Sequence, residues 1–68
     1  MLGKFYVALL YEGQYDLITG VDWDKDEWTC DGNRPLEFTQ TEARRLMRRI
    51  ATHGVLAAVL EVASWYTL

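Results

Sequence analysis

The chain has 68 residues, a net charge of −3, one cysteine and one histidine, and half of its residues are hydrophobic. This length allows one domain, residues 1–68, and a single cysteine excludes a disulfide scaffold within the chain. Three Trp, four Tyr and two Phe exclude a disordered tail, and no apolar run approaches the roughly 18 residues of a membrane span. We therefore expect a small, soluble globular domain.

The first half of the chain predicts three strands. Residues 4–11 are almost entirely apolar, which is typical of a central strand covered on both faces. After a turn at Gly13, residues 15–23 alternate and predict a second strand paired with the first, with one face formed by Tyr15, Leu17, Thr19, Val21 and Trp23. Residues 24–26 are a polar turn, and residues 27–30 predict a short third strand.

An amphipathic helix over residues 40–53 is the clearest predicted element. Thr39 and Glu42 have the spacing of a capping box, and Phe38 is placed to pack as a hydrophobic staple. Gly54 is typical of the position just after a helix. The apolar residues recur at helical spacing and form one stripe: Ala43, Leu46, Met47, Ile50 and Ala51.

Residues 55–62 predict the last strand. Gly54 ends the helix before them, and their β-branched residues favour extended structure: Val55, Val59 and Val62. We expect Trp65 and Tyr66 to pack near the end of this strand.

The expected fold class is α+β, with the element order β-β-β-α-β. A right-handed crossover would place the last strand beside the first and parallel to it. The result is a four-stranded, mostly antiparallel sheet of strand order 3-2-1-4, with the amphipathic helix packed on one face. The other face would carry apolar side chains such as Tyr6 and Leu10, which is usual for a surface that binds a partner.

The charges are unevenly distributed along the chain. Residues 12–31 sum to −6, residues 32–68 sum to +2, and Lys4 supplies the remaining positive charge. Four arginines lie on the helix opposite its apolar stripe and are called here the arginine face: Arg44, Arg45, Arg48 and Arg49. The simplest interpretation is a solvated face, in which Glu42 can pair with Arg45 and the arginines can pair with the acidic hairpin across space. The alternative is recognition of an acidic protein surface or of phosphate by guanidinium groups.

The second candidate surface is the acidic hairpin, residues 22–28, whose candidate binding residues are Asp22, Trp23, Asp24, Asp26, Glu27 and Trp28. Its D-x-D-x-D spacing resembles the start of an EF-hand loop. Glu27 and Asn33 stand where that loop needs glycine and a bidentate carboxylate, so we expect no calcium site. Turn chemistry is the simplest interpretation, and tryptophans beside the acids favour binding of a basic partner.

The sequence does not indicate catalysis. It contains one His, one Cys and one Ser, whose spacing does not bring them together, and no glycine-rich phosphate loop. We expect no catalytic residue, metal site or cofactor. His53 is expected to interact with the helix C-terminal dipole or with solvent, and Cys30 to be a small, half-buried apolar residue.

The leading functional interpretation is a non-catalytic protein–protein interaction module that masks a site on a larger partner. A homodimer through the exposed sheet face or an edge strand is also expected. In size, charge and layout the chain resembles accessory proteins of phages and mobile elements, some of which inhibit host defence or nucleic-acid machinery.

Two alternatives come from other classes. One is a small nucleic-acid-binding regulator that uses the arginine face, although the acidic net charge argues against it. The other is a structural subunit of an assembly. Residues 1–11 lack the cleavage site of a signal peptide, so we expect a cytoplasmic protein (in the host cytoplasm if it is phage-encoded) that does not bind membranes.

Overall fold

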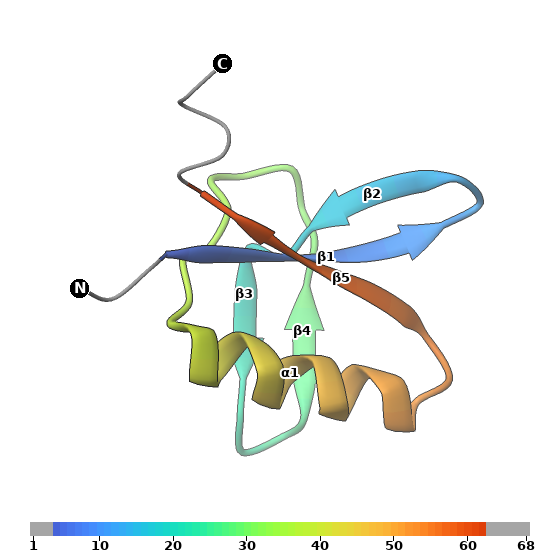
Figure 1. Ribbon diagram of the computed structural model, residues 1–68. Helices are drawn as coiled ribbons and strands as arrows, with labels where there is room; N and C mark the ends of the chain where they lie inside the picture. Colours follow the sequence, from blue (N-terminus) through green and yellow to red (C-terminus); the bar gives the residue numbers. More distant parts are fainter. Residues whose placement is uncertain (1–3, 63–68) are drawn as a thin grey trace.

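The structure is a computed structural model that describes residues 4–62 (Figure 1). Its elements, in chain order, are β1 (Phe5–Tyr11), β2 (Gln14–Leu17), β3 (Gly20–Asp22), β4 (Glu27–Thr29), α1 (Gln40–Thr52) and β5 (Leu56–Glu61). The strands form two antiparallel sheets, one of order β2-β1-β5 and one of order β3-β4. The α+β class is confirmed, whereas the prediction of one four-stranded sheet of order 3-2-1-4 is wrong.

The predicted second strand divides between Ile18 and Thr19. The Ile18 N–H donates to the Val7 carbonyl at 2.8 Å and extends the pairing of β2 with β1, whereas the Thr19 N–H donates at 2.8 Å to the carbonyl of Thr29, the last residue of β4. In one straight strand, Ile18 and Val21 would point to opposite faces. The division lets both side chains pack against the same core, which explains why the single sheet does not form.

The last strand lies beside the first, as predicted, but it runs antiparallel to it rather than parallel. The chain returns from the hairpin to the beginning of β1, where Phe5 and Phe38 exchange two backbone hydrogen bonds of 2.9 and 2.8 Å. Helix α1 therefore starts near the beginning of β1 and ends near its far end, so β5 must come back in the opposite direction (Figure 1). Trp65 and Tyr66 lie outside the described residues.

Helix α1 covers the inner face of the three-stranded sheet. The predicted capping box is confirmed, because the Glu42 N–H donates to Thr39 Oγ1 and the Thr39 N–H donates to Glu42 Oε1. The apolar stripe of the helix, the inner face of the sheet and residues beside the hairpin share one buried core, made of Val7, Leu9, Ile18, Phe38, Ala43, Leu46 and Ile50. Sequence periodicity therefore predicted both the helix and its buried side, except at Ala51, which belongs to the predicted stripe but is exposed.

Within β1, β2 and β5, no charged side chain lies on the opposite, outer face of the three-stranded sheet. The strand register places eight residues on it: Tyr6, Ala8, Leu10, Tyr15, Leu17, Leu56, Ala58 and Leu60. Helix α1 and the β3–β4 hairpin both pack on the inner face, so no element within residues 4–62 covers the outer one. Leu56 and Tyr15, at its two edges, are 68% and 59% exposed.

Candidate functional site

The acidic hairpin predicted from the sequence forms the tip of the β3–β4 hairpin. Asp22 Oδ1 accepts hydrogen bonds from the backbone N–H groups of Asp24 and Lys25, both at 3.1 Å. This pattern is an Asx turn, and Asp26 completes the tip with a left-handed backbone, φ 57°. Asp22 therefore has a structural role in the turn, as the simplest interpretation of the sequence proposed.

A polar clamp joins this tip to the last turns of α1. Arg49 Nη1 donates to the Trp23 carbonyl at 2.9 Å and to Asp26 Oδ1 at 3.0 Å, and His53 Nε2 lies 2.9 Å from Asp26 Oδ2. The hydrogen bond from His53, followed by the hydrogen bond and positive charge of Arg49, lowers the pKa of the Asp26 carboxyl. The clamp therefore favours an ionised Asp26 held between two donors from the helix.

The hairpin tryptophans pack against the same helix side chains. The guanidinium groups of Arg45 and Arg49 lie 5.0 and 5.5 Å from the Trp23 ring centroid, within the range of cation–π attraction. Trp28 meets the His53 ring edge-on, with centroids 5.1 Å apart. These aromatic contacts and the clamp turn the two surfaces predicted from the sequence into one composite surface.

Some predicted binding residues of the composite surface form no ion pair within residues 4–62. Arg44, Arg45 and Arg48 are exposed and form no ion pair with a carboxylate within residues 4–62. Asp24 and Glu27 at the hairpin are also exposed, and they form no ion pair with a basic side chain within residues 4–62. Their role in binding a partner stays a prediction, whereas Arg49 and Asp26 have a structural role in the clamp.

His53 is the member of the clamp that sequence reasoning did not connect to the hairpin. It occupies the C-cap position of α1, as its expected link to the helix end implies, but its side chain contacts Asp26 and Trp28. These residues lie 27 and 25 positions away in the sequence. The excess of acidic over basic residues in the hairpin was the one signal in the sequence that the hairpin would bind a basic side chain from a distant part of the chain.

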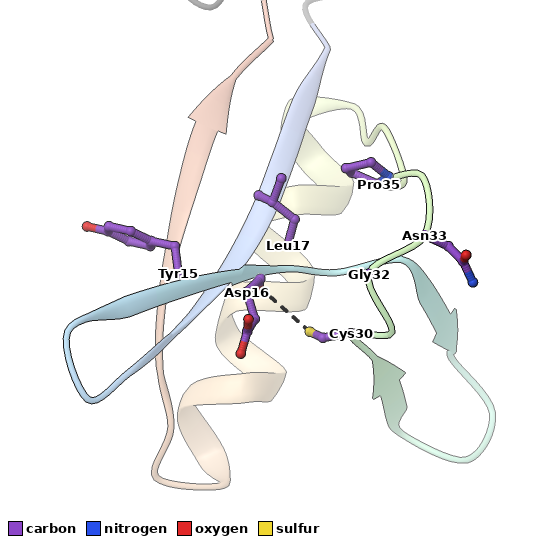
Figure 2. Close-up of a pocket in the computed structure, with 7 residues that line it drawn as sticks. All are labelled: Tyr15, Asp16, Leu17, Cys30, Gly32, Asn33 and Pro35. Carbon is purple, nitrogen blue, oxygen red and sulfur yellow. Dashed lines mark hydrogen bonds between the residues drawn. The ribbon is translucent and has the colours of Figure 1, made fainter.

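A shallow hollow of about 240 Å³ lies between β2 and the loop that follows β4 (Figure 2). Its lining is Tyr15, Asp16, Leu17, Cys30, Gly32, Asn33 and Pro35. The half-buried Cys30 thiol donates to the Asp16 carbonyl at 3.7 Å. Burial, and then the negative charges of Asp16 and Asp31, raise the pKa of the thiol. Cys30 is therefore held in its protonated form, which is a poor nucleophile.

The described residues 4–62 bring together no group of three His, Cys, Asp or Glu side chains that could hold a metal ion. No helix in this part of the chain has the length and apolar character needed to cross a membrane. Comparison with known proteins finds no significant match to a protein-family model, to a curated protein or to a solved structure. Functional inference therefore depends on the composite surface.

Proposed function

We propose that this protein is a non-catalytic interaction module that binds an acidic surface of a larger protein and masks it. The observation that carries the proposal is that one arginine of α1 contacts the hairpin while the other three have no carboxylate partner within residues 4–62. Arg49 is bound to the hairpin, while Arg44, Arg45 and Arg48 are exposed without a carboxylate partner in the described part of the chain.

The arrangement suits carboxylate recognition in two ways. A guanidinium group offers paired N–H donors that match the two oxygens of a carboxylate, and three such groups on one helix can engage several carboxylates together. Arg45 also lies over the Trp23 ring, which restricts the flexible side chain before it meets a partner. The net charge of −3 favours a localised acidic patch on a protein as the binding partner over the continuous phosphate backbone of a nucleic acid. The acidic remainder of the chain would repel a long polyanion.

Affinity purification with quantitative mass spectrometry tests this proposal. Wild type and the variants Arg48→Glu and Arg44→Glu/Arg48→Glu serve as baits, and Arg34→Glu is the matched control because Arg34 is an exposed arginine outside the helix. We expect an acidic partner whose enrichment falls about tenfold in the double variant and is retained in the control. Equal capture by all baits would contradict the proposal, as would retention of nucleic acid in gel-shift assays that weakens steeply with salt.

A further inference from the structure

We propose that β5 is a self-association edge, at which two copies of this chain join their three-stranded sheets into one continuous six-stranded sheet. The inference goes beyond the proposed function, because it concerns the sheet edge and not the arginine face. It starts from the backbone of β5, which is an edge strand and has no partner strand on the side away from β1 within residues 4–62.

The pairing of β5 with β1 determines which backbone N–H and C=O groups of β5 point toward β1 and which point away. The Val62 N–H donates to the Lys4 carbonyl at 2.9 Å, which continues the antiparallel ladder between β5 and β1. Alternation along that ladder directs the even-numbered residues of β5 toward β1. The N–H and C=O groups of Ala57, Val59 and Glu61 therefore point away from the sheet and are available to another strand.

The composition of β5 does not protect this edge. Its sequence is LAAVLE, with no proline or lysine and with one charge at its end. Natural edge strands are usually blocked by charges, prolines, bulges or a covering segment. The other edge strand of the same sheet, β2, is four residues long, carries Asp16 and lies beside the loop that contains Cys30. The two edges thus differ, and β5 is the one suited to strand addition.

The pattern of β5 matches a second copy of itself. Around a twofold axis at Ala58, antiparallel pairing places Leu56 opposite Leu60 of the other copy and Ala57 opposite Val59. Every directly opposed pair within the strand is then apolar, and Glu61 remains outside the paired segment. This register also gives the 68% exposed Leu56 a leucine neighbour across the two copies. Both helices α1 lie on one face of the joined sheet, because opposed residues of paired strands point to the same side.

The oligomeric state of the full chain tests the inference. In light scattering or sedimentation at micromolar concentration, we expect a mass twice the 7.9 kDa of one chain. Leu56→Lys places a charge in the paired edge and should weaken association by about tenfold to a hundredfold. Tyr15→Lys is the matched control, because it changes an exposed apolar residue of the same outer face at the opposite edge. It should leave association unchanged.

Cross-linking tests the register in a Cys30→Ser background. Ala58 should face its own copy in a non-hydrogen-bonded pair, with Cα atoms about 4.5 Å apart, a separation that a disulfide can span. We expect Ala58→Cys to form a disulfide dimer under mild oxidation, whereas Leu60→Cys, which faces Leu56, should not.

A monomer at all concentrations overturns the inference. So does loss of the dimer with Tyr15→Lys while Leu56→Lys retains it, because that result points to packing through the outer face. Absence of the Ala58→Cys cross-link also overturns it. None of these outcomes bears on the arginine face, so this inference and the proposed function can fail separately.

Discussion

The three-stranded sheet with α1 and the β3–β4 hairpin are held in place by different forces. The first unit is joined by apolar side chains with no solvent exposure, among them Val7, Leu46 and Ile50. The hairpin contributes half-buried tryptophans and Cys30 to the margin of that core, and its tip is fixed by the polar clamp. Apolar burial does not depend on protonation and is not weakened by ionic screening, whereas ion pairs and cation–π contacts at the surface are screened.

This difference suggests that the molecule has one stable unit and one unit that opens more easily. The hairpin carries Trp23, beneath Arg45, and therefore supports the surface proposed to bind a partner. A weakly held hairpin next to a firm helix would let that surface adjust to a partner without unfolding the core.

The largest expected effect comes from the core. Ile50 is completely buried between α1 and the sheet, so Ile50→Ala removes apolar contacts and leaves a cavity. We expect a loss of about 2–5 kcal/mol in the free energy of unfolding, and about 0.5–1.5 kcal/mol for Ile50→Val. Urea denaturation followed by circular dichroism measures both. A loss below about 1 kcal/mol for Ile50→Ala would contradict the view that apolar burial holds this unit together.

A smaller and more local effect is expected at the clamp. Arg49→Met keeps the apolar stem of the side chain but removes the donors to Trp23 and Asp26. Amide hydrogen exchange in β3 and β4 should accelerate by an amount equivalent to about 1–2 kcal/mol, while amides of β1 and β5 keep their protection. Arg48→Met is the control, since Arg48 is exposed and has no ion pair within residues 4–62. Equal loss of protection in both sheets would show that the hairpin is not a separate unit.

The sequence predicted the helix well because its signals are local. Thr39 and Glu42 mark its start and Gly54 marks its end, each within a few residues of the boundary, and the observed helix ends one residue before the predicted boundary. The strands were also placed close to their true positions. The sheet topology was not, because residues 15–23 alternate without interruption and the division at Ile18 depends on a shared core. Gly20 was a weak signal, since glycine within a strand often marks a close approach, and Thr29 Cβ would lie 3.6 Å from a Cβ at this position.

The candidate site shows the same limit. Composition and the helical wheel identified the arginine face and the acidic hairpin, including the residues that meet. Pairing between these two surfaces was one interpretation of the sequence, but the sequence did not show that Arg49 and Asp26, 23 positions apart, would form the pair. Arg49 lies at the border of the arginine face, next to the apolar stripe, and is half-buried in the structure. Arg44 lies at the opposite border of the same face and is exposed, so the helical wheel alone did not show which border arginine would contact the hairpin.

The smallest expected effect is the pH dependence of the clamp. His53 and Arg49 lower the pKa of Asp26 in the folded chain, so the ionised carboxylate stabilises the folded state above the pKa of the unfolded chain. That stability is lost as the pH falls through the lower, folded value. The difference in unfolding free energy between wild type and Asp26→Asn should therefore shrink as the pH falls from about 5 toward about 2. Because the Asp26 side chain is 39% exposed, added salt should reduce this difference further.

Asp24→Asn controls for the change in net charge. A difference that is the same at about pH 2 and about pH 5 would show that the carboxylate charge does not hold the hairpin to the helix. The Arg49 hydrogen bond to the Trp23 carbonyl and the tryptophan contacts would then hold it there.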